Sequence, residues 1–210
     1  MPVMDPVVTD ISHHNNVISF SSIKTAGIVG IIHKASQGTS FVDKMYDQRM
    51  PKALNAGLLW GAYHFATDAP VKKQVDFFLK SAQPTEKSLL ALDYEPNPQG
   101  GTMDLDQARE WCQLVFEKTG QKPVIYSGHL IKQDLGNDED DFLGSHRLWL
   151  AQYGLKAKVP AAWKDYWLWQ YTGDGIGPKP HGVDGMSGDQ LDLNVFNGKR
   201  ETLIKQWSKS

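Results

Sequence analysis

The 210-residue sequence has a single cysteine, Cys112, and therefore lacks the second thiol that an intramolecular disulfide needs. The same shortage excludes a zinc site built from several cysteines. Lysine and arginine total 22 against 24 aspartate and glutamate residues, which gives a formal net charge of -2. This balance lacks the broad basic face of a nucleic-acid-binding protein, so we expect no nucleic-acid partner.

Long apolar runs are also missing. No stretch approaches the ~20 consecutive apolar residues of a membrane-spanning helix, so we expect no membrane partner. The opening residues, MPVMDPVVTD, lack the basic and apolar regions of a secretory signal. We therefore expect either a protein made in the cytoplasm or a secreted one whose leader has been removed.

Short apolar runs instead alternate with amphipathic helical patterns. Eight runs are typical of strands, at residues 7–11, 28–35, 58–65, 89–94, 123–127, 147–153, 167–171 and 191–196. Helical patterns cover residues 21–26, 44–56, 71–82 and 104–118. Alternation of strand and helix predicts parallel strands with crossover helices, and eight strands favour a closed barrel over a doubly wound open sheet.

The second half of the chain has few helical patterns. Residues 154–189 contain many glycines and prolines and no amphipathic stretch. We therefore predict one α/β domain over residues 1–210, an irregular TIM-like β/α barrel with a helix-poor second half.

Polar residues recur at the ends of the predicted strands, where barrels of this type carry their chemistry. They include Asp10, Lys34, His64, Asp93, Glu95, Tyr126, Gln170, Tyr171 and Asp192. This recurrence predicts a single site at one end of the barrel.

Asp93 and Glu95 form the most informative pair. Residues two apart on a strand point to the same side, with Cα atoms about 6.5 Å apart. Two such carboxylates repel, so one is expected to stay neutral, and a neutral acid beside a carboxylate suits glycoside cleavage. The alternative is an exposed strand end, or a pair neutralised by Lys34. Asp10 and Asp192 near the same opening favour catalysis.

Aromatic residues concentrate between positions 149 and 171, which hold four of the seven tryptophans and three of the seven tyrosines. Aromatic rings with polar tips suit the flat faces of sugars, although core and rim packing is the better explanation for about half of them. Strand alternation places Trp167, Trp169 and Tyr171 on one side. We expect Tyr171 to line a substrate groove and Trp167 to pack.

Other chemistries have little support. No serine lies in a G-x-S-x-G turn, and Cys112 lies within a predicted helix. Asp189, Asp192 and Asn194 lack the spacing of an EF-hand loop, so we expect no metal and no cofactor.

Several motifs in fixed order identify a family resemblance. They are VVTDISHHN, KASQGTSFVD, GAYHFA, ALDYEPN, PVIYSG, LWLAQY, WLWQYT and LDLNVFNG, spread from Val7 to Gly198. This set resembles the lysozymes of glycoside hydrolase family 25. The resemblance implies an irregular β/α barrel that hydrolyses the β-1,4 bond between N-acetylmuramic acid and N-acetylglucosamine in the peptidoglycan of bacterial cell walls.

The same resemblance assigns roles to residues. Glu95 is similar to the family's general acid, Asp93 to its partner carboxylate, and Asp10 and Asp192 to two further acidic groove residues. Tyr63, Tyr126 and Gln170 resemble residues that line the groove. The stretch GPKPHGVDGMSGDQ is longer than usual for the family, which leaves the contacts of that rim open.

The resemblance also implies a metal-independent enzyme, a monomer whose partner is the glycan strand of peptidoglycan. A lone catalytic domain without a leader suits a phage or prophage endolysin released by lysis, or an injected muralytic effector, and a domain excised from a longer protein is a further alternative. Two alternatives stay open: a chitin-type glycosidase of similar barrel, and a non-catalytic module that binds wall glycan.

Overall fold

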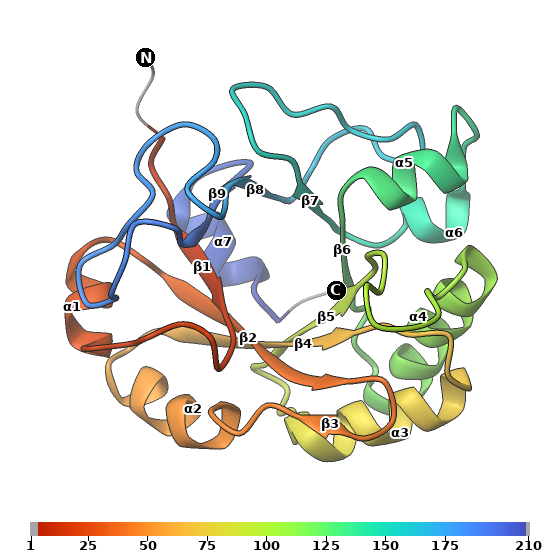
Figure 1. Cartoon of the computed structure of the whole chain (residues 1–210), viewed down its shortest axis with the longest axis horizontal. Helices are drawn as coiled ribbons and strands as arrows, with labels where there is room; N and C mark the ends of the chain where they lie inside the picture. The colour runs from red at the N-terminus through yellow and green to blue at the C-terminus, as the bar shows by residue number, and fades with distance from the viewer. Residues whose placement is uncertain (1–3, 209–210) are drawn as a thin grey trace.

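Eight strands close into a barrel in the computed structural model, which describes residues 4–208 (Figure 1). Around the barrel they are β1 (Val8–Ile11), β2 (Gly30–Gln37), β4 (Leu59–Phe65), β5 (Leu89–Asp93), β6 (Val124–Ser127), β7 (Leu148–Ala151), β8 (Leu168–Thr172) and β9 (Asp192–Phe196). A short strand, β3 (Phe41–Val42), pairs with β2 alone. Because β1 pairs with both β2 and β9, the barrel is confirmed and the open-sheet alternative is wrong.

The last strand runs against its neighbours. Strand β9 is antiparallel to β1 and to β8, whereas the other barrel pairs are parallel. The expectation of parallel strands is therefore wrong for β9. An antiparallel strand can follow its neighbour without a crossover helix, and the segment between β8 and β9 contains none. The reversal places Asp192, the first residue of β9, opposite Asp10 of β1, at the end of the barrel where the other strands finish.

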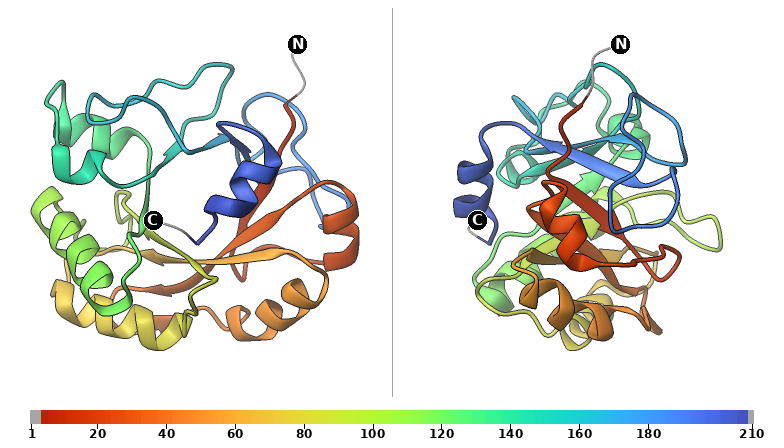
Figure 2. Two further views of the ribbon diagram at one scale, coloured as in Figure 1. Left: turned by 180° about the vertical axis from the view of Figure 1, so that it is seen from behind. Right: turned by 90° about the vertical axis from the view of Figure 1, so that its left-hand side faces the viewer.

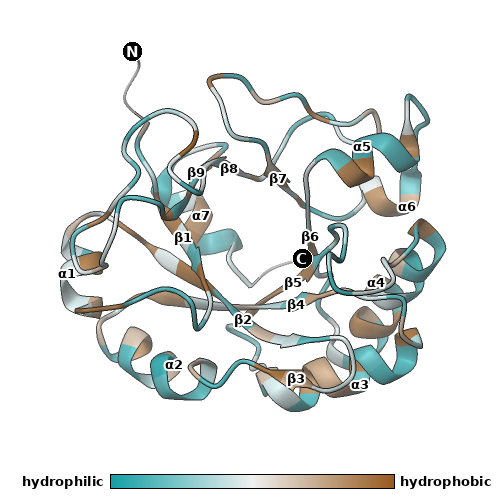
Figure 3. Cartoon of the chain, in the orientation of Figure 1, coloured by the Kyte–Doolittle hydropathy of each residue, from teal (hydrophilic) through white to brown (hydrophobic). Residues whose placement is uncertain are grey.

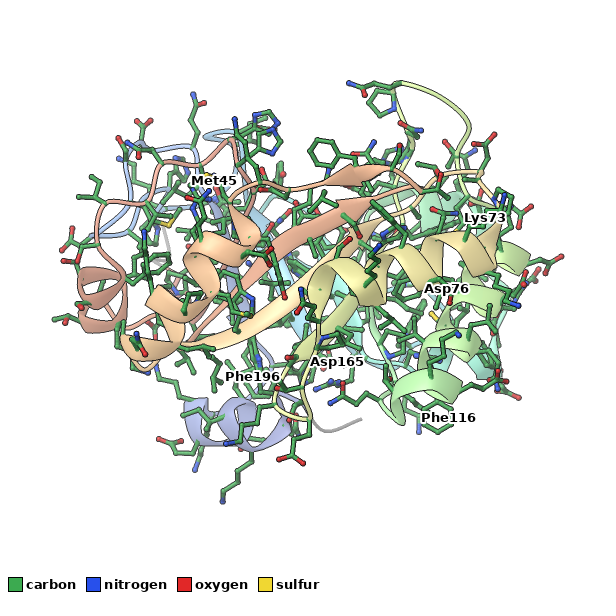
Figure 4. The ribbon with its side chains drawn as sticks, turned by 90° about the horizontal axis from the view of Figure 1, so that it is seen from below. Met45, Lys73, Asp76, Phe116, Asp165 and Phe196 are labelled. Carbon is green, nitrogen blue, oxygen red and sulfur yellow. The ribbon has the colours of Figure 1, made fainter. Side chains whose placement is uncertain are left out.

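Four helices cover the first half of the barrel, where the helical patterns predict them. They are α1 (Phe20–Thr25), α2 (Tyr46–Asn55), α3 (Val71–Ala82) and α4 (Leu105–Thr119). Figure 3 shows hydrophilic and hydrophobic residues alternating along α3 and α4, as expected of helices with one buried side. These two helices lie side by side, and Asp76 of α3 pairs with Lys118 of α4 at 3.1 Å (Figure 4).

Two local sequence features mark the start and the end of α4. The Asp104 side chain accepts a hydrogen bond from the Gln107 backbone, while the Gln107 side chain accepts one from the Asp104 backbone. This capping box satisfies two N–H groups at the start of the helix. Gly120 ends the helix with a φ of 71°, a left-handed conformation that glycine adopts without strain.

Loops replace helices in much of the second half (Figure 1). Helices α5 (His129–Leu135) and α6 (Asp141–Gly144) lie between β6 and β7, and α7 (Arg200–Gln206) follows β9. None of these three was predicted, because helices of this length show too little periodicity. The segments 152–167 and 173–191 contain no helix, which confirms the helix-poor second half.

One end of the barrel is closed by the segment that includes α7 (Figure 2). The Trp207 indole donates a hydrogen bond to the carbonyl oxygen of Trp60 at 2.9 Å. Its ring lies against Gly30, where a Cβ atom would come within 2.6 Å of it. Gly30 and Trp60 lie where β2 and β4 begin, so the opposite end, where most strands finish, is left for a site.

Apolar side chains fill the barrel near this closed end, including Val8, Ile32, Ala91, Val124 and Leu168. A larger cluster packs between the strands and the outer helices. Within residues 4–208, no helix has the length and apolar character to cross a membrane.

Candidate active site

The open end of the barrel contains a cavity of about 280 Å³. Its lining is rich in carboxylates and aromatic rings: Asp10, Ser12, His14, Lys34, Tyr63, Phe65, Asp93, Glu95, Tyr126, Trp149, Tyr153, Gln170, Asp174 and Asp192. Eight of the ten residues that the sequence singles out are brought together here. The exceptions are Tyr171 and His64, whose buried ring hydrogen-bonds with Ser36 and Gln74.

The end of β5 positions the central pair. Asp93 is the last residue of this buried strand, and Glu95 follows two residues later, before Pro96. Between them Tyr94 points away from the cavity, since its hydroxyl donates to Asp134 of α5 at 2.6 Å. The Tyr94 N–H donates to the carbonyl oxygen of Tyr126, which extends the strand pairing past Asp93. Strand alternation therefore places both carboxylates in the cavity, as predicted.

Burial governs the charge of this pair. It raises the pKa of Glu95 to about 7, with a further contribution from the negative charge of Asp10. Burial and the Glu95 charge also raise the pKa of Asp93, which Lys34 opposes. Among the described residues, Asp93 Oδ1 is buried without a hydrogen-bond partner. The charge that raises the Glu95 pKa thus comes from Asp10, whereas the sequence argument took it from the other member of the pair.

Asp10 lies at the centre of a hydrogen-bond chain contributed by five strands. Gln170 Nε2 donates to both Asp10 carboxylate oxygens at 2.9 and 3.0 Å, and Asn194 Nδ2 donates to one of them at 2.7 Å. The Tyr126 hydroxyl donates to Gln170 Oε1 at 2.9 Å, and Trp149 Nε1 donates to Asn194 Oδ1 at 2.6 Å. An indole N–H can only donate, so Trp149 fixes the orientation of the Asn194 amide toward Asp10.

Two opposing effects act on Asp10. Burial raises its pKa to about 6, while the hydrogen bonds from Asn194 and Gln170 lower it. Amide donors favour the charged form of a carboxylate. The chain thus stabilises a carboxylate that burial alone would leave neutral.

Asp192 faces Asp10 across the β1–β9 pair. Burial raises its pKa to about 9, and the charge of Asp10 adds to this. Burial and the neighbouring Asp10 charge thus both favour the protonated form of Asp192. A Cβ atom at Gly173 would overlap with the Asp192 carboxylate and with the Tyr153 hydroxyl, so a larger residue there would displace these two side chains.

Lys34 contributes the positive charge of the cavity. Its ammonium group lies 4.8 Å from the centre of the Phe65 ring and 5.3 Å from that of Phe41, and it donates to Gln37 Oε1 at 2.7 Å. Burial lowers its pKa, and the charge of Asp93 raises it. Two aromatic faces and one amide thus hold a cation close to the acidic pair.

Tyr171 does not reach the cavity. Its side chain is fully buried, and its hydroxyl donates to the carbonyl oxygen of Pro180 at 3.0 Å. The prediction that Tyr171 lines the groove is wrong, because Gln170 occupies the inward-facing position of β8. Trp167 packs as predicted, edge-on to Phe196, which lies near α7 (Figure 4).

The sequence argument missed Asn194 and undervalued Trp149. A polar residue within the apolar run LDLNVF was the available signal for Asn194, which was weighed only as a cation ligand. Within residues 4–208, no group of three or more His, Cys, Asp or Glu side chains is arranged to hold a metal. Asn194 instead links Trp149 to Asp10.

Comparison with known proteins gives the family. The sequence pattern of glycosyl hydrolases family 25 matches residues 9–179. The chain belongs to this family. It is 29% identical over 209 residues to lysozyme M1 of Streptomyces globisporus, a match covering 93% of this chain and 69% of that protein. It is 30% identical to YegX of Escherichia coli O157:H7 and spans only 60% of that protein's length.

Solved structures agree with this assignment. A bacterial lysozyme from Streptomyces coelicolor superposes with a TM-score of 0.85 at 28% identity, covering 98% of each chain. A family GH25 lysozyme from Aspergillus fumigatus gives a TM-score of 0.79 at 28% identity, covering 96% of this chain and 98% of that one. This family 25 protein is therefore a glycoside hydrolase of the lysozyme type.

Proposed function

We propose that Glu95 is the general acid, and Asp93 its partner carboxylate, in a muramidase reaction on peptidoglycan. The bond cleaved is the β-1,4 linkage between N-acetylmuramic acid and N-acetylglucosamine. The observation that carries this proposal is the pKa of Glu95, raised to about 7 by burial and by Asp10. A carboxylic acid that keeps its proton near neutral pH can protonate the departing oxygen.

The first step transfers the Glu95 proton to the glycosidic oxygen as the C–O bond breaks. The anomeric carbon then carries developing positive charge, as in other glycoside cleavages. The negative charge on Asp10 lies close enough to raise the Glu95 pKa, and it favours this charge distribution. Asp10 thereby supports both the protonated acid before cleavage and the cation-like centre during it.

Asp93 has two possible roles in the next step. It either orients the substrate's own N-acetyl group for attack on the anomeric carbon, or it accepts a proton from an attacking water. The first route retains the anomeric configuration and the second inverts it. The configuration of the first-formed product, read by NMR, distinguishes them.

The remaining residues of the site hold the glycan. Tyr63, Tyr126 and Lys34 line the cavity together with Gln170. Aromatic faces cover sugar rings, while the amide and the ammonium group suit hydroxyl and acetamido oxygens. We expect a monomer to be active, which size-exclusion chromatography combined with an activity assay can test.

Digestion of purified peptidoglycan tests the assignment. Mass spectrometry of the products should show muramic acid at the new reducing ends, and the Glu95→Gln protein should release none. New reducing ends of N-acetylglucosamine would contradict the proposed bond. Equal rates on chitin and peptidoglycan would favour the chitin-type alternative, and binding without cleavage would favour a wall-binding module.

A further inference from the structure

A second cavity, of about 470 Å³, adjoins the first. It shares Glu95, Tyr126 and Tyr153 with the catalytic cavity, and its other lining residues are Gly128, His129, Lys132, Ala151, Gln152 and Lys158. A glycan bound at Glu95 therefore borders directly on this space. Its outer walls are α5 and the loop between β7 and β8.

The charge of the second cavity is opposite to that of the first. Glu95, on the shared wall, is its only acidic lining residue, whereas Lys132 and Lys158 supply two ammonium groups. Among the described residues, neither lysine forms an ion pair with a carboxylate. Burial lowers the pKa of Lys132, and so does the charge of Lys158, which places the two cations close enough to repel. An anion between them would relieve that repulsion.

Gln152 holds this arrangement in place. Its Oε1 accepts a hydrogen bond from Lys132 Nζ and a longer one, 3.3 Å, from the Lys158 backbone N–H. Its Nε2 donates to the carbonyl oxygen of Lys156 at 2.7 Å. A neutral amide thus fixes the ammonium group without cancelling its charge, and two of the three Lys132 donors remain for a ligand.

Peptidoglycan has anions of the required kind on only one of its two sugars. Muramic acid carries a lactyl group whose carboxyl is either free or joined to a stem peptide, and that peptide has carboxylates of its own. N-Acetylglucosamine carries none. We propose that the Lys132–Lys158 cavity binds a carboxylate borne by a muramyl residue near the cleaved bond. This inference rests on the proposed muramidase function and adds the feature by which the enzyme would favour peptidoglycan over chitin.

The test uses three soluble glycans of one length. The first carries stem peptides, the second has been stripped by an amidase so that lactyl carboxylates are free, and the third is the stripped glycan with those carboxylates converted to methyl amides. The quantity measured is the ratio of kcat/KM on each charged glycan to kcat/KM on the neutral one. Comparing the two charged glycans separates a lactyl carboxylate from a peptide carboxylate.

Lys132→Met combined with Lys158→Met should lower that ratio by roughly tenfold or more, mainly through KM, because charge-assisted hydrogen bonds are lost. A fall only with the stripped glycan identifies the lactyl carboxylate, a fall only with the peptide-bearing glycan identifies a carboxylate of the stem, and a fall with both shows that the cavity binds either one. Lys132→Arg keeps the charge and should keep the ratio. Lys52→Met removes an exposed lysine on α2 and is the matched control.

A ratio equal to that of the wild type in the double variant would overturn the proposal. The single variant Lys158→Met, at an exposed loop position, gives the same reading if the double variant folds poorly. Failure of the muramidase assignment is a separate result, because the wild-type protein would then release no muramic acid ends from any of the three glycans.

Discussion

Strands β1 to β5 alternate with α1 to α4, whereas β7 and β8 lead into loops, yet both halves of the barrel meet at one cavity. The helix-covered half supplies Asp93 and Glu95, at the end of a fully buried strand. The loop-covered half supplies Trp149, Gln170 and Asn194, which orient Asp10 through hydrogen bonds. The comparison indicates that the groups proposed to react come from the regular half, while the groups that position the neighbouring Asp10 come from the irregular half.

The largest expected effect tests the regular half. Glu95→Gln should lower kcat by about 10²–10⁴-fold, since the amide has nearly the same shape but cannot donate the proton. The melting temperature should stay close to that of the wild type. Release of reducing ends from peptidoglycan and thermal melting of the same preparation measure both. More than about a tenth of wild-type activity would show that another group is the acid.

Asp93, the carboxylate at the end of β5, should matter nearly as much as Glu95. Asp93→Asn should reduce kcat by about 10²-fold or more, since it removes the group that orients or activates the nucleophile. Asp47→Asn, which neutralises an exposed carboxylate on α2, is the control for loss of charge alone. Similar kcat values for the two variants would remove Asp93 from the reaction.

A change of pH profile tests the coupling between Asp10, which residues of the irregular half orient, and Glu95. The negative charge of Asp10 raises the Glu95 pKa, so Asp10→Asn should let Glu95 ionise more readily. Glu95 must be protonated to act, so the alkaline limb of kcat/KM should lie at lower pH in the variant than in the wild type. The residual activity of the variant, followed across pH, measures the shift. An unmoved limb would mean that Asp10 and Glu95 do not interact in the working enzyme.

A milder change tests the irregular half alone. Trp149→Phe removes the donor to Asn194 Oδ1 and leaves a buried acceptor unpaired, which typically costs about 1–3 kcal/mol of unfolding free energy. Without that donor the Asn194 amide can rotate, and kcat should fall by less than in the carboxylate variants. Chemical denaturation and kinetics report the two quantities. A larger loss of kcat than in Asp93→Asn would reverse the proposed division of roles.

The smallest expected effect lies outside the cavity. Tyr171→Phe deletes only the hydrogen bond to Pro180, so it should lower stability by about 1 kcal/mol and leave KM unchanged. Urea unfolding and steady-state kinetics check both values. A raised KM would mean that Tyr171 contacts the glycan after all.

The regular half was predictable because its signals are local. Apolar runs marked the strands, helical periodicity marked α2, α3 and α4, and strand alternation placed Asp93 and Glu95 on one side. Each of these signals spans only a few residues of sequence. The family motifs added the order in which the elements occur.

The irregular half was harder because its decisive contacts are distant in sequence. The hydrogen bond between Trp149 and Asn194 joins residues 45 positions apart, and no sequence pattern near either residue predicts it. Strand alternation correctly grouped Trp169 with Tyr171, but it was wrong for Trp167, which packs in the other apolar cluster. Both sides of a barrel strand are buried, so alternation also did not show which side faces the cavity. The direction of β9 could not be predicted either, because an apolar run is compatible with both parallel and antiparallel pairing.

The pairing of β1 with β9 also bears on how the enzyme is made. Asp10 of β1 is synthesised before its donors Gln170 and Asn194, which belong to β8 and β9. Domains acquire their native contacts only once the segments concerned have been synthesised. A nascent chain carrying Asp93 and Glu95 but not yet β9 thus has its reacting groups without the support for Asp10. Hydrolytic activity should therefore appear only after the last strand has been translated.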